Sequence, residues 1–130
     1  MPNIQEINPP ELWDAGKNKT HIVKVGNMAF IGGQRSIDDK GDLIGKGDIH
    51  KQAQQSYAYL IAAVKAVGGT ATNIVKTTTY LTHPDYVIAT RPAREEVFGN
   101  RRPAGTIVVI SSLATPGAMI EVEGIAVLDE

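Results

Sequence analysis

The chain of 130 residues is 42% hydrophobic and 21% charged, which is typical of one globular domain over residues 1–130. Its 13 basic and 14 acidic residues leave a net charge of −1, so we expect neither nucleic acid nor an anionic membrane as a partner. Because the sequence contains no cysteine, no apolar run of roughly 20 residues and no signal-peptide pattern, it excludes disulfides and thiolate catalysis and predicts a cytoplasmic protein without a membrane span.

The N-terminal part of the chain predicts a lead-in segment followed by a β-hairpin. Prolines and a glycine interrupt residues 1–20, so we expect this segment to be irregular. Residues 21–25 and 28–31 are mainly β-branched or apolar, and Gly26–Asn27 suits a two-residue turn that requires positive φ. The pattern therefore predicts two antiparallel strands.

Two glycines and a long helix are expected next. Gly32 and Gly33 end the second strand, where glycine indicates a bulge or the close approach of another group. Residues 48–67 carry apolar side chains at steps of three and four. Asp48 suits the N-cap and a glycine follows the last turn, so this range predicts a helix.

The C-terminal half predicts a strand, a helix and two further strands. Residues 73–81 and 106–110 are rich in β-branched side chains, and the composition of 106–110 favours a strand buried on both faces. Residues 84–98 predict a helix that begins near Pro92, because proline is tolerated only in the first turn. Residues 118–127 alternate, which predicts a strand with one buried face.

The resulting order, ββ–α–β–α–ββ, predicts an α+β fold in which two helices cover one face of a mixed sheet. The other face of such a sheet also needs a cover. A second copy of the same chain is the simplest one, so we expect a homo-oligomer.

Two acidic side chains share one face of the last predicted strand. Glu121 and Glu123 alternate with Ile120 and Val122, which point to the opposite face. Glu121 is a candidate general acid or base, although most carboxylates are simply solvated or salt-bridged. Glu123 either shares the same cleft or forms an ion pair with a lysine at a subunit interface, and we favour the second interpretation.

Several segments match a known family pattern from residue 21 onward. They are VGNMAFIGGQ at 25–34, QSYAYLIAAVKAVGGT at 55–70 with NIVKTTTYL at 73–81, and PAG at 103–105 with MIEVEGIAV at 119–127. The chain resembles the RidA family of enamine and imine deaminases, also called the YjgF/YER057c/UK114 family. The resemblance implies a chorismate-mutase-like fold, a homotrimer, and ligand clefts between subunits for a small-molecule substrate.

The resemblance also implies roles for individual residues. The family glutamate that handles water matches Glu121, and the family's backbone contacts to substrate match Gly33 and Ile107. Gly32 stands where the family has a serine. The arginine that clamps the substrate carboxylate in a bidentate pair is replaced by Gly105.

The replacement at Gly105 leaves alternatives open. It either widens the cleft for a substrate larger than 2-aminoacrylate, or reflects loss of deaminase activity in this branch. Arg102, and after it Arg101, is a candidate for a compensating clamp, although two arginines before a strand are more often solvated.

We therefore expect hydrolytic deamination of a reactive enamine or imine, and the alternative is a trimer that binds a small metabolite without catalysis. Ribonuclease activity is attached to some relatives of the family, but basic and aromatic residues are not interleaved here. No metal or cofactor is expected, because His21, His50 and His83 lie in separate elements without ligand spacing.

Overall fold

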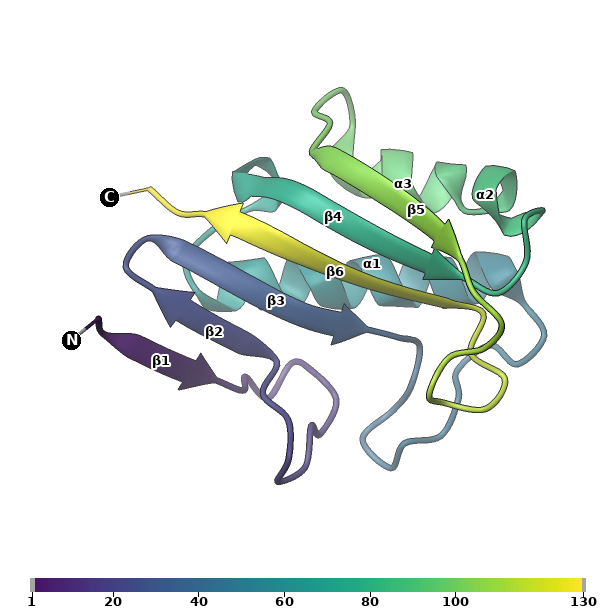
Figure 1. Cartoon of the computed structure of the whole chain (residues 1–130), viewed down its shortest axis with the longest axis horizontal. Helices are drawn as coiled ribbons and strands as arrows, with labels where there is room; N and C mark the ends of the chain where they lie inside the picture. Colours follow the sequence, from purple (N-terminus) through teal and green to yellow (C-terminus); the bar gives the residue numbers. More distant parts are fainter. Residues whose placement is uncertain (1, 130) are drawn as a thin grey trace.

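A single mixed sheet of six strands forms one layer of the molecule, and the helices pack on one of its faces (Figure 1). The computed structural model describes residues 2–129. The strands lie in the order β1-β2-β3-β6-β4-β5, and β5 pairs parallel with β4 while the other pairings are antiparallel. The strands are β1 (Ile4–Ile7), β2 (Ile22–Val25), β3 (Met28–Gln34), β4 (Ile74–Leu81), β5 (Ala104–Val109) and β6 (Ile120–Val127).

The predicted hairpin is confirmed and extends further than expected. β2 and β3 pair around Gly26, whose φ of 59° is accessible to glycine at little cost, as the first central position of a type II′ turn requires. The pairing of β3 with β6 shifts register between Ile31 and Gln34, which confirms the irregularity expected at the two glycines.

The helices follow the predicted caps closely. α1 (Ile49–Ala66) begins after Asp48, whose Oδ1 accepts a hydrogen bond from the Lys51 amide at 3.1 Å. A short 3₁₀ turn, η1 (Ala71–Asn73), leads into β4. The second helical region divides into α2 (Tyr86–Ala89) and α3 (Arg91–Phe98), with Pro92 in the first turn of α3 as predicted.

The core lies between the sheet and α1. Alternate residues of β4 and β6 point to the helices and are buried, and the outward residues of β6, including Glu121 and Glu123, are half-buried. This confirms the alternation predicted for the last strand. The largest fully buried apolar side chains are Tyr57, Ile22, Leu60, Ile74, Leu81 and Ile120.

Two predictions need correction. The strand predicted at 106–110 is not buried on both faces: β5 is an edge strand, and Ile107 and Val109 are 41% and 44% exposed. β-branched residues favour any pleated strand, so composition alone does not distinguish an edge from a centre. Residues 1–20 are irregular only in part, because β1 pairs antiparallel with β2 and Trp13 is buried. Within residues 2–129, no helix is both long and apolar enough to cross a bilayer.

Candidate active site

The carboxylate of Glu121 lies against the glycine bulge of β3. A Cβ built on Gly33 would overlap Glu121 Oε2 and would lie 2.7 Å from Glu121 Cδ. Gly33 therefore has no side chain because the Glu121 side chain occupies that space. This confirms that a group approaches the strand closely at these glycines, and it identifies the group as the candidate catalytic carboxylate.

Arg35 holds the other oxygen of Glu121. Its Nη1 donates a hydrogen bond to Glu121 Oε1 at 3.2 Å, and the two side chains are 12% and 21% exposed. The Arg35 guanidinium also stacks on Trp13, with its carbon 4.7 Å from the ring centroid. An ion pair screened from water and backed by a ring is better ordered than an exposed one, so Arg35 fixes the orientation of the carboxylate.

A buried hydrogen-bond network attaches the N-terminal segment to this end of the sheet. Trp13 Nε1 donates to Gln34 Oε1 at 3.1 Å, and Gln34 Nε2 donates to His21 Nδ1 at 3.0 Å and to the Gly32 carbonyl at 3.1 Å. His21 Nε2 then donates to the Trp13 carbonyl at 2.6 Å. The Gln34 amide nitrogen can only donate and the Trp13 carbonyl can only accept, so the ring accepts at Nδ1 and donates at Nε2. His21 is thus a structural residue that holds Trp13 under Arg35.

These groups surround a cavity of about 260 Å³ that opens over Glu121. Its wall includes Gly33, Arg35, Lys19 and Thr20, so charged and hydroxyl groups face the carboxylate. The volume is close to the lower limit of small-molecule sites, roughly 300 Å³. The cavity suits the reacting end of a small polar molecule.

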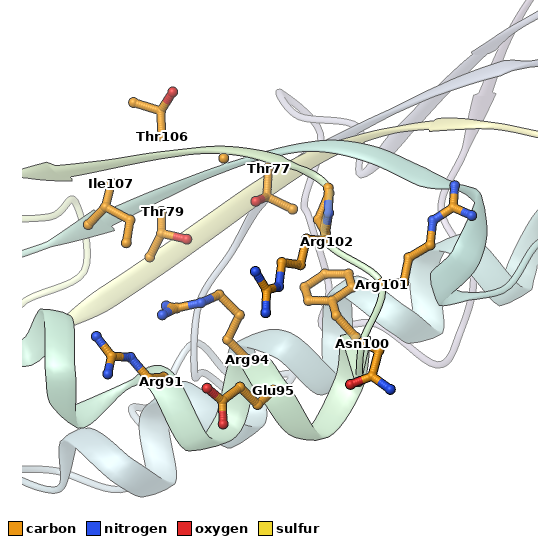
Figure 2. Close-up of a pocket in the computed structure, with 14 residues that line it drawn as sticks. Thr77, Thr79, Arg91, Arg94, Glu95, Asn100, Arg101, Arg102, Thr106 and Ile107 are labelled. Carbon is orange, nitrogen blue, oxygen red and sulfur yellow. The ribbon is translucent and has the colours of Figure 1, made fainter.

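A second, larger cavity of about 710 Å³ lies between α3, β5 and the loop that joins them. Gly105 and Ile107 form part of its wall, and Arg102 points into it from the loop (Figure 2). The wall is open at Gly105, because a Cβ there would have Thr77 Oγ1 as its nearest neighbour at 3.7 Å. Gly105 therefore adds space without being required by the backbone.

The predicted site residues thus fall into two groups within one chain. Tyr80 of β4 pairs with Glu121 on one side and with Val108 on the other, so Glu121 and Val108 share the face directed away from the helices. Successive residues of β5 point to opposite faces, so Gly105 and Ile107 point away from the face of Val108 and toward the helices. The structure brings Glu121 and Gly33 together, and separately Gly105, Ile107 and Arg102, but it does not join the two groups within one chain.

Within residues 2–129, Glu123 forms no ion pair with a lysine. It accepts a hydrogen bond from the Tyr80 hydroxyl, and this bond, with desolvation and the charges of Glu123 and Glu121, raises the pKa of Tyr80. The neighbouring Lys76 Nζ donates instead to the Thr77 carbonyl at 2.9 Å and to Thr106 Oγ1 at 3.0 Å.

Sequence reasoning missed three arginines at these cavities. Arg35 was hidden because an irregular strand end makes side-chain direction unpredictable from alternation. Arg91 and Arg94 carried a usable signal, since residues three apart share one face of a helix. Both line the larger cavity.

Comparison with known proteins agrees with this architecture. The sequence model of the family described as Endoribonuclease L-PSP matches residues 14–128. A RutC family protein of Pyrococcus horikoshii is 36% identical over 107 residues, which cover 82% of this chain and 84% of the relative. The chain belongs to the endoribonuclease L-PSP family, that of the RidA/YjgF proteins.

Other members of the RidA/YjgF family are similar over most of their length. A protein of the mite Dermatophagoides farinae named 2-iminobutanoate/2-iminopropanoate deaminase is 27% identical over 110 residues, 85% of each chain. The crystal structure of a protein of unknown function of the conserved Rid family from Yersinia pestis superposes with a TM-score of 0.90 at 27% identity. That match covers 97% of this chain and all of the Yersinia chain.

Proposed function

We propose that this RidA-family protein hydrolyses a reactive enamine or imine to a carbonyl compound and ammonia. The observation that carries the proposal is the placement of Glu121, whose carboxylate is oriented by Arg35 and lies against Gly33 at the cavity. A carboxylate that faces a polar cavity can move protons to and from water. The mite relative named as an imine deaminase supports the same chemistry.

The proposed reaction needs one base and one water molecule. Arg35 binds Oε1 of Glu121, so Oε2 is the oxygen available to take a proton from water. The hydroxide adds to the C=N carbon and the protonated Glu121 returns its proton to the nitrogen, which gives a neutral carbinolamine. Glu121 then takes the hydroxyl proton and passes it to the nitrogen, so that the C–N bond breaks with release of ammonia and the oxygen is retained in the new carbonyl group. An imine plus water thus yields a carbonyl compound plus ammonia, without a cofactor or metal.

A complete cleft requires a second copy of the chain. Glu121 lies on the sheet face opposite to the helices, and that face also carries Phe30, which is 42% exposed. The second wall, at Gly105 and Ile107, lies along the edge strand β5. We propose that copies associate as a chorismate-mutase-like homotrimer, in which β5 of one copy lies beside Glu121 of the next. The exposed apolar side chains at both places support this arrangement.

The decisive experiment compares Glu121→Gln with the wild-type protein. Imino acids of increasing size are generated in the assay, and the ammonia released is measured. We expect Glu121→Gln to lose most of the rate enhancement, by about a hundredfold or more. Glu123→Gln is the matched control, because it removes a carboxylate from the same strand face. Full activity of Glu121→Gln on the best substrate would refute the proposal.

The second candidate function is non-catalytic binding of a small metabolite. Gly105 favours it, because the family resemblance implies an arginine that clamps the substrate carboxylate at this position, and glycine supplies no such group. Mass spectrometry separates the two functions: a binding protein returns its ligand unchanged after incubation, and a hydrolase converts it with release of ammonia.

A further inference from the structure

The larger cavity carries a strong excess of positive charge. Arg91 and Arg94 of α3 line it together with Arg101 and Arg102 of the loop, and Glu95 is the one carboxylate among its lining residues. Among residues 2–129, no carboxylate lies within 4.0 Å of any of these four guanidinium groups. The cluster is therefore not neutralised by the part of the chain that the structure describes.

Two of these arginines reach toward each other, and a third lies beside them. Figure 2 shows Arg94 reaching up from α3 and Arg102 reaching in from the loop, with Arg91 beside Arg94 on the helix, while Arg101 points away from the cavity. The Arg94 side chain is half-buried, so its charge is less screened by water than the charges of the exposed Arg91 and Arg102.

The other residues that line the cavity are partly apolar, which strengthens the attraction of the arginines for an anion. Ile107 and Phe98 supply apolar surface, and Thr77 is only 5% exposed. A site partly enclosed by low-dielectric walls strengthens the attraction between a guanidinium and an anion, compared with the same pair in open water. The open position at Gly105 leaves room for a carbon chain longer than that of a small imino acid.

We propose that this cavity binds a small dianion, so that the substrate is an imine or enamine acid with a second acidic group. One carboxylate forms a bidentate pair with a single guanidinium. Three guanidinium groups that line one cavity would remain mutually repulsive around one such charge, and a second acidic group relieves that repulsion. The claim about the substrate rests on the proposed deaminase function, and the claim about anion binding does not.

The experiment measures binding without any reaction, using isothermal titration calorimetry of the full chain at low and moderate salt. The probes are glutarate and 2-oxoglutarate as dicarboxylates, butyrate and 2-oxobutyrate as monocarboxylates of similar size, and inorganic phosphate. We expect the dicarboxylates to bind about tenfold tighter than the monocarboxylates, as one additional charge-assisted pair predicts. Preference for phosphate over glutarate would still support a dianion site and would identify the second group as a phosphate.

Variants test which arginines are responsible. Arg94→Gln and Arg91→Gln should each weaken glutarate binding by about tenfold or more, with a smaller effect on butyrate. Arg101→Gln is the control that removes the same charge from a side chain directed away from the cavity. Unchanged thermal unfolding establishes that each variant is folded, and the exposed Arg91 provides the safer substitution if Arg94→Gln unfolds.

Three results would overturn the proposal. They are equal binding of dicarboxylates and monocarboxylates, an effect of Arg101→Gln as large as that of Arg91→Gln, and salt-dependent binding of an RNA oligomer that dicarboxylates do not displace. The deaminase proposal fails separately. If the dicarboxylates bind more tightly than the monocarboxylates but Glu121→Gln keeps full hydrolytic activity, only the deaminase mechanism is refuted.

Discussion

The carboxylate of Glu121 occupies the space in which any other residue at position 33 would place its Cβ. Gly33 has no positive φ, so its backbone does not require glycine. The requirement comes instead from the side chain of a residue on the neighbouring strand β6. The candidate catalytic carboxylate can therefore take this position only because β3 has no side chain at residue 33.

Replacing Gly33 tests this contact. We expect Gly33→Ala to displace the Glu121 carboxylate, to lower the free energy of unfolding by about 1–3 kcal/mol, and to reduce ammonia release nearly as far as Glu121→Gln does. Gly32→Ala is the matched control, because a Cβ there would lie 3.5 Å from the Thr20 carbonyl oxygen, an ordinary contact. Urea unfolding and the ammonia assay measure both effects. Equal behaviour of the two variants would contradict the argument.

Gly105 should tolerate substitution. The nearest neighbour of a Cβ at this position is 3.7 Å away, so Gly105→Ala should raise the free energy of unfolding by about 0.5 kcal/mol through the lower entropy of the unfolded chain.

Gly105→Arg tests whether an arginine at this position, which the family resemblance implies for related deaminases, would increase activity. We expect it to raise the rate on small monocarboxylic imino acids relative to the wild type, because it returns a bidentate anchor to the cavity wall. Kinetics with 2-aminoacrylate generated in the assay measure the change. Inactivity of both proteins would favour the binding function, and a wild type that is already fully active on this substrate would mean that another group anchors its carboxylate.

Arg35 should stabilise the fold as well as orient Glu121. We expect Arg35→Gln to cost about 1.5–3 kcal/mol of unfolding free energy, because the bond to Glu121 Oε1 is charge-assisted and largely screened from water. A double-mutant cycle with Glu121→Gln isolates the coupling between the two side chains, expected at about 0.5–3 kcal/mol. A coupling energy near zero would show that Arg35 acts only through its stacking on Trp13.

Tyr80 should make the protein sensitive to alkaline pH. The hydrogen bond to Glu123 is the main cause that raises the pKa of Tyr80 above 10.0 in the folded chain, so the unfolded chain loses this proton first. The contribution of this hydrogen bond to the free energy of unfolding is fully present below about pH 10. It is lost as pH rises through the pKa of Tyr80 in the folded state. Urea unfolding between about pH 8 and pH 11 should show a smaller loss in Tyr80→Phe. Burial raises the pKa of Tyr59 as well, so Tyr59→Phe is the comparison, and a loss that neither variant reduces would exclude both tyrosines.

Complementation between variants tests the composite cleft. Glu121→Gln removes the proposed base from one side of the cleft, and Gly105→Trp blocks the space at the other side, so each variant alone should be inactive. Refolding the two together should restore part of the activity, because some clefts then combine an intact Glu121 from one copy with an open position 105 from another. Light scattering of the same samples reports the oligomeric state. A monomer, or a mixture without recovery, would argue against clefts between copies.

Local patterns in the sequence determined the elements and their faces. The Gly26 turn, the Asp48 cap, the start of α3 at Pro92 and the alternation around Glu121 depend on dihedral preferences and on neighbours in the chain, so each could be predicted. The family resemblance placed Glu121 and Gly33 in one site, and the structure shows them in contact.

Tertiary structure alone decided what those residues touch. The register between β3 and β6 sets Glu121 over Gly33 and beside Arg35, and the edge position of β5 exposes a strand whose composition predicted burial. The packing of α3 on α1, below the β5 edge of the sheet, places Arg91, Arg94 and Arg102 at one cavity. Contacts between residues far apart in the chain depend on strand order and helix packing, and local sequence preferences do not specify either one.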